Sequence, residues 1–263
     1  MMEAVTMMQQ ERRVYLIEEL LKEFGEYGRI GIPEDEAGQR RLLRALFNLR
    51  MPGEASEEFL RVQDAYLKEE TREKGITDID SLKPVEPGIY LWRGDITTLR
   101  CDAVVNAANA AMLGCFRANH SCIDNAIHTF SGVQLRLACD RIMKGRKAKT
   151  GSVMITPAFN LPSRYVIHTV GPVVSGSLTE EECGLLEKCY RSCLELADSY
   201  GLDSIAFCCI STGVFRFPGQ KAAEIAVRTV RSHRSKTGSR IKVIFNVFKE
   251  EDRLFYERQL ESV

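Results

Sequence analysis

Residues 10–70 alternate apolar and charged side chains at the spacing of amphipathic helices. One apolar stripe runs from Tyr15 to Phe24 and a second from Leu42 to Leu49, with charged residues between the apolar positions. A third helix is expected from about residue 56 to 73, because Ser56 followed by two glutamates is a typical helix start. Three short helices cannot bury their apolar faces alone. They are expected either to form a cap on a larger domain or to offer a docking surface to a protein partner.

The pattern changes at about Gly88, where short apolar runs begin to alternate with helical patterns. Strands are predicted at residues 89–92, 103–108, 152–158, 165–170, 204–210 and 241–248. Helices are predicted at residues 123–130, 133–144, 180–200, 219–232 and 250–260. This alternation predicts an α/β fold, with a largely parallel sheet covered by helices on both faces. We therefore expect a helical extension at residues 1–84 and an α/β domain at 85–263, with a linker around Gly75 to Pro87.

Charge and cysteine content differ between these two regions. The 263 residues include 36 basic and 36 acidic side chains, but residues 1–85 hold 13 basic and 18 acidic ones and so carry a net charge of −5. The balanced total argues against a strongly basic nucleic-acid-binding protein.

No apolar run reaches the roughly 18 residues of a membrane span, and residues 1–13 lack a secretory signal pattern, so a cytoplasmic protein is expected. All nine cysteines lie between Cys101 and Cys209, and in a reducing compartment we expect them to be buried, reactive or metal-bound.

Four polar loops lie where doubly covered sheets bind ligands, beyond strands and before helices. They are Gly-Asp-Ile-Thr at 94–97, Asn-Ala-Ala-Asn at 106–109, the segment 114–124, and Ser-Thr-Gly-Val-Phe at 211–215. With Ile-Asp-Asn-Ala-Ile-His at 123–128 and Ile-His-Thr-Val-Gly-Pro at 167–172, they occur in the order found in the macrodomain family. Residues 85–263 therefore resemble an ADP-ribose-binding macrodomain, which implies a three-layer α/β/α fold with a mixed, largely parallel sheet.

The sequence looks most like the zinc-dependent microbial branch of that family. Cys115, His120 and Cys122 interrupt a loop that is otherwise a run of glycines, and an acidic helical extension precedes the domain. Three ligands of this kind suit a catalytic zinc ion, because a tetrahedral ion keeps one position open for water or substrate. The spacing is not that of a standard zinc finger, and buried cysteines beside a surface histidine would explain it equally well. The resemblance places the three residues opposite the distal ribose and implies one zinc ion per chain.

The resemblance also implies how ADP-ribose would be bound. The carboxylate of Asp95 suits the exocyclic amine of adenine, although it could instead cap a helix, and Phe248 would stack on adenine unless it is a core residue at a strand end. Backbone N–H groups would bind the phosphates, with Gly213 permitting close approach, and Phe215 would cover the distal ribose. The expected substrate-binding residues are Asp95, Ile96, Asn106, Asn109, Ser211, Thr212, Gly213, Val214, Phe215 and Phe248.

Asp124 and Asn109 are the predicted catalytic residues. Asp124 lies at the start of a predicted helix, where it could serve only as a cap that complements the helix dipole. In the hydrolytic branch of the family, the acidic residue at this position orients or activates a water near the anomeric carbon, and Asn109 would hydrogen-bond the distal ribose. Because two thiolates would neutralise the zinc charge, we expect the ion to orient and polarise the substrate rather than to generate hydroxide.

The resemblance therefore implies a zinc-dependent protein-ADP-ribose hydrolase. It favours mono-ADP-ribose on an acidic side chain, joined through an O-glycosidic ester, and a lipoyl carrier protein as the target. Three alternatives remain at this point: an ADP-ribose reader without turnover, an O-acetyl-ADP-ribose deacetylase, and a partner-binding module that uses residues 1–85. Asp124 and the three metal ligands argue against the reader, which needs neither.

Overall fold

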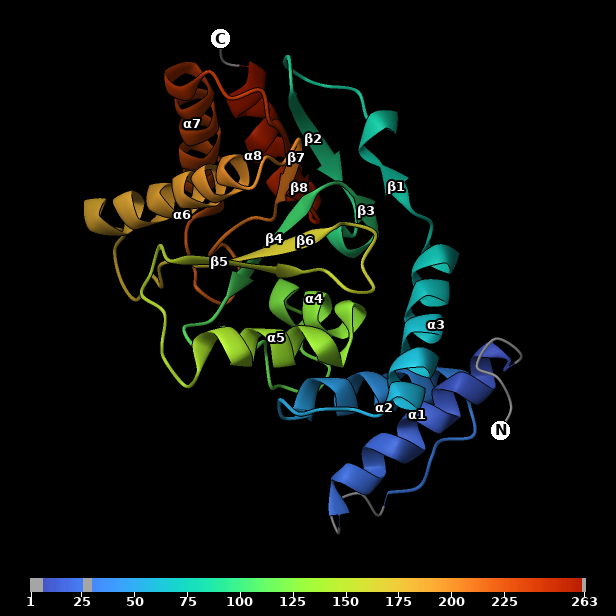
Figure 1. Cartoon of the computed structure of the whole chain (residues 1–263). Helices are drawn as coiled ribbons and strands as arrows, with labels where there is room; N and C mark the ends of the chain where they lie inside the picture. The colour runs from blue at the N-terminus through green and yellow to red at the C-terminus, as the bar shows by residue number, and fades with distance from the viewer. Residues whose placement is uncertain (1–6, 26–29, 262–263) are drawn as a thin grey trace.

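A six-stranded sheet forms the centre of the molecule. The computed structural model describes residues 7–25 and 30–261. The strands follow the order β2-β8-β7-β4-β6-β5, and every neighbouring pair is parallel except β5 and β6, which are antiparallel. Their bounds are β2 (Ile89–Arg93), β4 (Ala103–Ala108), β5 (Val153–Pro157), β6 (Tyr165–Val170), β7 (Ser204–Phe207) and β8 (Lys242–Val247). The mixed, largely parallel sheet expected from the sequence is confirmed (Figure 1).

Helices cover both faces of this sheet and complete the three-layer α/β/α fold. One face is covered by α4 (Ile123–Ser131) and α5 (Val133–Met143), and the other by α6 (Glu180–Ser199), α7 (Gly219–Thr237) and α8 (Glu250–Glu261) (Figure 1). The predicted strand at 204–210 is wrong at its end, since β7 stops at Phe207 and a turn follows. Among the described residues, no helix combines the length and the apolar character that crossing a bilayer requires.

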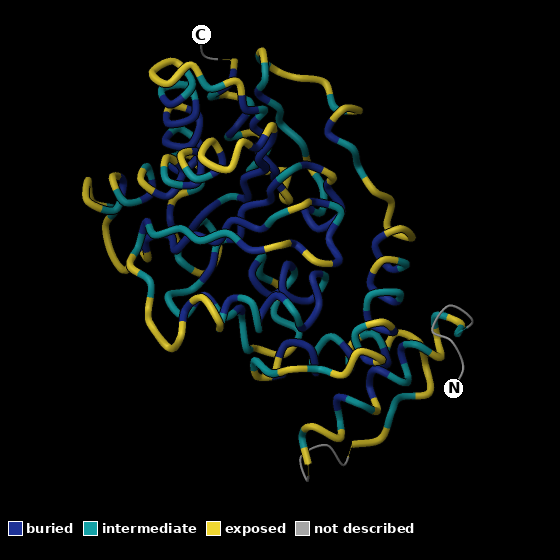
Figure 2. The backbone as a smooth tube through the Cα atoms, viewed as in Figure 1, coloured by how far each residue is buried: buried dark blue, intermediate teal, exposed yellow. Residues whose placement is uncertain are grey.

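The central strands are buried on both faces. Val104, Val105 and Ile205 have no exposed surface, and a tube coloured by burial is darkest along these strands (Figure 2). Parallel strands covered on both faces are typically continuous apolar runs, because neither face meets water. Asn106 on β4 and His168 on β6 are polar exceptions that are also fully buried. A buried polar side chain needs hydrogen-bond partners, so these two residues direct attention to the carboxyl end of the sheet.

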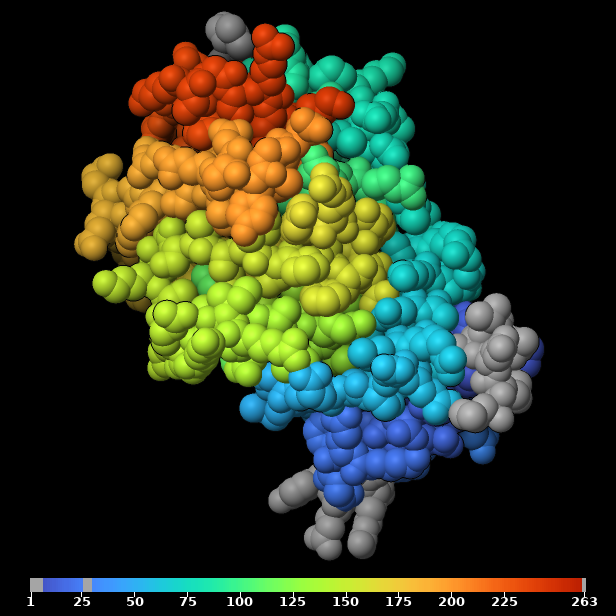
Figure 3. Space-filling model, in the orientation of Figure 1, coloured from blue at the N-terminus to red at the C-terminus, as the bar shows by residue number. Residues whose placement is uncertain are grey.

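Three N-terminal helices form a second hydrophobic cluster. The apolar stripes of α1 (Gln9–Glu23), α2 (Glu36–Leu49) and α3 (Glu57–Lys74) bury one another. The side chains of Asp35 and Ser56 cap α2 and α3 by accepting hydrogen bonds from backbone N–H groups three residues on. The cluster also includes Val133 at the start of α5, so these helices lie against the α/β domain (Figure 3). Their apolar faces are covered, as expected for a cap rather than for an open docking surface.

The segment after α3 is more ordered than the predicted linker. Strand β1 (Thr77–Asp78) pairs in parallel with β3 (Leu99–Arg100), and a short 3-10 helix follows at Ile79–Ser81. Ile79 is buried in the main hydrophobic core. The predicted linker thus contains a short paired strand and a buried residue, which the sequence did not indicate because a two-residue strand is too short to produce a periodic signal.

Candidate active site

The predicted ligand-binding loops meet at one edge of the sheet. Because β2, β4, β7 and β8 run parallel, their carboxyl ends point to the same edge (Figure 1). The N–H of Gly94 donates to the carbonyl of Val247 at 3.1 Å, and the side-chain amide of Asn246 donates to the carbonyl of Gly94 at 2.9 Å. The N–H of Val174 similarly donates to the carbonyl of Phe215 at 2.9 Å. These bonds hold neighbouring loops side by side.

Asp95 occupies the loop after β2 and is already hydrogen-bonded within the protein. One carboxylate oxygen accepts from the N–H of Thr97 at 3.0 Å and from its hydroxyl at 2.6 Å, and so caps the 3-10 helix Ile96–Thr98. The other oxygen lies 3.0 Å from the ammonium group of Lys74, at the end of α3. Burial raises the pKa of Asp95, but the bonds from Thr97 and the charge of Lys74 outweigh it and hold the pKa below its usual value. Asp95 is therefore an ionised acceptor as well as a cap.

Phe248 directly follows β8, in the loop beside Asp95. Its side chain is 77% exposed, so the alternative of a core residue at a strand end is wrong. A large exposed ring leaves apolar area in water that a stacked ligand would cover. Ile96, by contrast, is only 2% exposed, so it can contribute to ligand binding through its backbone alone.

The loop after β7 has an unusual backbone path. Ser211 has a φ of +66°, in the left-handed region that residues other than glycine seldom adopt. The N–H of Phe217 donates to the carbonyl of Ser211 at 3.0 Å and closes the loop. A Cβ at Gly171 would lie 2.0 Å from Ser211 Oγ and 2.9 Å from Ile210 Cγ2, so a larger residue there would force these side chains to move. A Cβ at Gly213 would meet open space, and Val214 beside it is 62% exposed, so the middle of the loop is accessible to a ligand.

Asp124 lies at the centre of a buried polar network. It is 5% exposed, and its carboxylate accepts from the side-chain amides of Asn106 at 2.8 Å and Asn109 at 3.3 Å. The N-cap of α4 is Cys122, whose Sγ accepts from the N–H of Asn125 at 3.4 Å, so Asp124 is not the cap, although it lies in the first turn of α4, where its charge complements the helix dipole. Burial raises the pKa of Asp124 to about 6, and the hydrogen bond from Asn106 opposes that rise. The structure therefore places both predicted asparagines on one buried carboxylate.

Two buried histidines lie beside this carboxylate. The Nε2 of His128 is 3.7 Å from it, but burial holds the pKa of His128 well below its usual value, so the imidazole is neutral and forms no ion pair. His168 is hydrogen-bonded at both ring nitrogens, to Asn106 and to Thr156, each at 3.1 Å. The donor atoms of His128, Cys139 and His168 lie within 4.8 Å of one another. Because both nitrogens of His168 are engaged, this cluster is a polar part of the core rather than a metal site.

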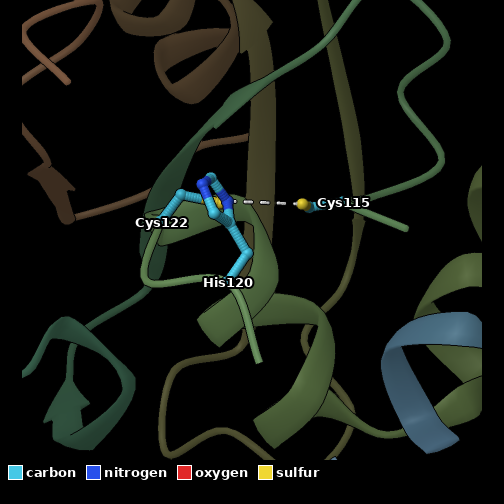
Figure 4. A group of neighbouring side chains, drawn as sticks. All are labelled: Cys115, His120 and Cys122. Atoms are coloured by element: carbon cyan, nitrogen blue, oxygen red, sulfur yellow. Dashed lines mark hydrogen bonds between the residues drawn. The ribbon is translucent and has the colours of Figure 1, made fainter. Parts of the chain in front are cut away.

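Cys115, His120 and Cys122 form a compact cluster on the loop before α4. Their side chains point toward one another, with all ligand atoms within 4.8 Å and Cys115 Sγ 3.5 Å from His120 Nδ1 (Figure 4). Ligands of a tetrahedral zinc ion lie about 3.5 to 3.8 Å apart, given bond lengths of about 2.0 to 2.3 Å. All three residues are half-buried, which disagrees with the alternative of buried cysteines beside a surface histidine. Two thiols and an imidazole fit zinc and disfavour magnesium and calcium.

Three residues that contact the metal-ligand loop, residues 114–122, were not predicted from the sequence. Arg44 and Asn48 of α2 hydrogen-bond its backbone. Buried Arg136 of α5 donates to the carbonyl of Leu113 at 2.8 Å, and its guanidinium carbon lies 4.2 Å from the centre of the Phe116 ring. The sequence around Arg136 offered one indication of its role, because an arginine interrupts the otherwise apolar stripe of α5. The sequence around Arg44 and Asn48 offered no such indication, since their partners lie more than 70 positions away.

Comparisons with known proteins agree with this geometry. Residues 105–226 match the family model described as Macro domain. The chain is 56% identical to the protein-ADP-ribose hydrolase of Treponema medium, covering 96% of this chain and 99% of that one. It is 48% identical to a protein-ADP-ribose hydrolase of Staphylococcus aureus, covering 94% of each. Both alignments therefore extend over most of the N-terminal helices as well.

Solved structures show the same fold. The Trypanosoma brucei macrodomain in complex with ADP-ribose matches with a TM-score of 0.64 at 32% identity, covering 86% of this chain and 96% of that one. The Oceanobacillus iheyensis macrodomain with ADP matches with a TM-score of 0.61 at 34% identity, covering 68% of this chain and 94% of that one. The fold and its loop-lined edge thus define a macrodomain-type α/β protein. At the level of sequence identity found, the chain belongs to the macrodomain family.

Proposed function

We propose that this protein is a zinc-dependent hydrolase that removes mono-ADP-ribose from modified protein side chains. The observation that carries the proposal is the proximity in sequence of a buried carboxylate and a metal-ligand cluster, since Asp124 follows Cys122 by two residues. A module that only binds ADP-ribose needs neither feature. Relatives that are 56% and 48% identical are named protein-ADP-ribose hydrolases, which supports the same activity here.

The proposed ligand lies along the carboxyl edge of the sheet. Asp95 would accept from the adenine amine, and the exposed ring of Phe248 would stack on the base. The backbone of Ile96 and of residues 211–215 would bind the diphosphate. A site made of backbone dipoles needs no lysine cluster, in agreement with the balanced charge of the chain.

Asp124 and Asn109 are the proposed catalytic residues. Hydrolysis breaks the bond between the anomeric carbon and the acceptor oxygen, and water supplies the new hydroxyl of ADP-ribose and the proton of the released acid. The transition state resembles an oxocarbenium ion, so a nearby carboxylate stabilises its positive charge. Asp124 would also orient the attacking water, and Asn109, which holds that carboxylate at 3.3 Å, would position the distal ribose.

Cys115, His120 and Cys122 are the proposed metal ligands, with one zinc ion per chain. When bound, zinc supplies a Lewis acid that can polarise and orient oxygen atoms of the substrate. Cys122 belongs to the cluster and is also the N-cap of α4. The geometry of the cluster and the position of Asp124 on α4 therefore depend on each other. A distortion of the loop would therefore displace the carboxylate as well.

The proposal extends to the acceptor and the cellular setting. The resemblance to the zinc-dependent microbial branch supports an acidic acceptor joined through an ester, and a lipoyl carrier protein as the target, in the cytoplasm. A direct test incubates the purified protein with proteins that are mono-ADP-ribosylated on Asp or Glu, and in parallel on Ser or Arg. Released ADP-ribose is measured by chromatography. We expect release from the acidic substrates and little from the others.

The same assay separates the alternatives. If no acceptor releases ADP-ribose while calorimetry still shows ADP-ribose binding, the protein is a reader and not a hydrolase. If only O-acetyl-ADP-ribose is consumed, it is a deacetylase of a small molecule. Protein with Asp124→Asn serves as the matched control for contaminating activity, because this substitution keeps the size of the side chain and removes its charge.

A further inference from the structure

The metal-ligand loop, residues 114–122, contains no helix or strand. Its backbone polar groups therefore cannot be satisfied by regular secondary structure and must find other partners. Within the loop, the N–H of His120 donates to the carbonyl of Arg117 at 3.2 Å. Two of its remaining contacts are made by side chains of α2 in the N-terminal extension.

Arg44 of α2 forms the first contact with the loop. Its Nη2 donates to the carbonyl of His120 at 3.3 Å and to the Oδ1 of Asn125 at 2.9 Å, and its Nε donates to the same Oδ1 at 3.2 Å. The Nδ2 of Asn125 in turn donates to the carbonyl of Arg117 at 3.0 Å. One half-buried guanidinium thus fixes both sides of the turn that presents His120.

Asn48, one helical turn further along α2, forms the second contact. It is 1% exposed, and its Oδ1 accepts from the N–H of Asn119 at 2.9 Å. Its Nδ2 donates to the hydroxyl of Thr129 at 2.9 Å, and that hydroxyl donates to the carbonyl of Asn125 at 2.7 Å. Asn119 has a φ of +54°, in the left-handed region that asparagine adopts more readily than most residues, and the bond from its N–H to Asn48 anchors the backbone just before His120.

We infer that Arg44 and Asn48 are positioning residues for the metal site, so that α2 of the N-terminal extension preorganises the loop that binds zinc. The inference rests on the proposed function for the identity of the metal. Residues that hold metal ligands in place commonly change metal affinity about 10- to 100-fold when removed. Loss of either side chain would let the loop sample conformations in which His120 and the two thiols no longer converge, and binding would then have to restore the order.

The experiment compares Arg44→Met and Asn48→Ala with the unaltered full-length protein. Arg41→Met is the matched control, because Arg41 lies on the same helix and is exposed. Zinc affinity is measured by competition with a chromophoric chelator, and cobalt substitution reports the thiolate–cobalt absorption band. We expect each test variant to bind zinc about 10-fold or more weakly, with a weaker or shifted cobalt band and a far-ultraviolet dichroism spectrum that is unchanged. Arg41→Met should match the unaltered protein.

Hydrogen exchange supplies a readout that does not depend on the metal. The amide of Asn119 should exchange faster in the metal-free Asn48→Ala protein, and the amides of residues 115–122 should do so in Arg44→Met. If both variants fold, bind zinc as tightly as the unaltered protein and exchange at its rate, the inference is wrong. If the unaltered protein binds no zinc, the zinc dependence in the proposed function is wrong. Unchanged hydrogen exchange in both variants would separately overturn the positioning role of Arg44 and Asn48.

Discussion

The ammonium group of Lys74 lies 3.0 Å from a carboxylate oxygen of Asp95 and 3.3 Å from the centre of the Phe130 ring. The N-terminal helices thus reach the edge of the sheet where adenine is proposed to bind. About a third of each side chain of the ion pair is exposed, at 34% and 37%, so solvent screens it. Such pairs contribute only about 0 to 1 kcal/mol to stability. The ion pair therefore matters more for whether Asp95 can accept a hydrogen bond from adenine than for the stability of the fold.

Lys74→Met is expected to tighten ADP-ribose binding by up to about fivefold at low salt, the factor that 1 kcal/mol allows. The substitution leaves one oxygen of Asp95 free for the adenine amine, while Thr97 still holds the other. Calorimetry with ADP-ribose and with its inosine analogue, which has no exocyclic amine, checks this. The gain should be absent with the analogue and in the control Lys68→Met, which alters an exposed position of the same helix. Weaker ADP-ribose binding by Lys74→Met would contradict the prediction.

Phe248→Ala is expected to weaken ADP-ribose binding without affecting the fold. Stacking of a base on an aromatic side chain is worth about 1 to 3 kcal/mol, so the Kd should rise roughly 5- to 150-fold. Because the ring is 77% exposed, its loss leaves no cavity and the Tm should stay within a degree or two. Calorimetry and a thermal melt measure the two effects. An unchanged Kd would show that Phe248 does not contact the bound ligand.

Asp124→Asn is expected to lower turnover far more than ligand affinity. Removal of a positioned acid–base or charge-stabilising group commonly costs about 10²- to 10⁴-fold in rate, whereas ADP-ribose affinity should change only a few-fold. Single-turnover release of ADP-ribose gives the rate, and calorimetry gives the affinity. The zinc content of the variant must be measured alongside, since Cys122 lies two residues away. Parallel losses of rate and affinity would instead point to a binding role.

Protein produced without added zinc is expected to contain about one zinc ion per chain, held by the three ligands of a catalytic site. Cys115→Ala, His120→Ala and Cys122→Ala should each lower that content, because a tetrahedral ion with only two protein ligands is held weakly. Cys209→Ala is the matched control, since Cys209 is also half-buried but lies outside the cluster. Mass spectrometry measures the number of zinc ions per chain in each protein. Full zinc content in all three variants would show that the assignment of the ligands is wrong.

Local sequence patterns predicted the sheet and the position of the buried carboxylate well. Strand β4 matches its prediction at both ends, because a run that is apolar except for Asn106 lies between the polar residues Asp102 and Asn109. Asn109 directly follows β4 and Asp124 lies in the first turn of the helix that comes next, so both lie at the carboxyl end of the same strand, where they meet. The predicted strand at 241–248 is one residue too long at each end, since β8 spans Lys242–Val247, and Phe248 therefore lies exposed just beyond the strand.

The contributions of the extension could not be predicted in the same way. Arg44 and Asn48 belong to the amphipathic helix α2, and the packing of α2 against α1 already accounts for its pattern of apolar residues. Their polar contacts to the metal-ligand loop depend on how the N-terminal helices pack against the α/β domain, over sequence separations of 71 and 76 residues. Periodicity describes one helix at a time, so it says nothing about such contacts.

Val133 connects the two parts of the molecule in a way that affects how they unfold. It opens α5 of the α/β domain, yet its side chain is buried in the cluster of the N-terminal helices. Its N–H donates to the fully buried side chain of Gln63 on α3 at 2.9 Å, so the start of α5 is completed by a residue from the extension. Melting of the three helices would expose Val133 and leave that N–H unpaired, and the cost of this coupling favours one cooperative thermal transition over two separate ones.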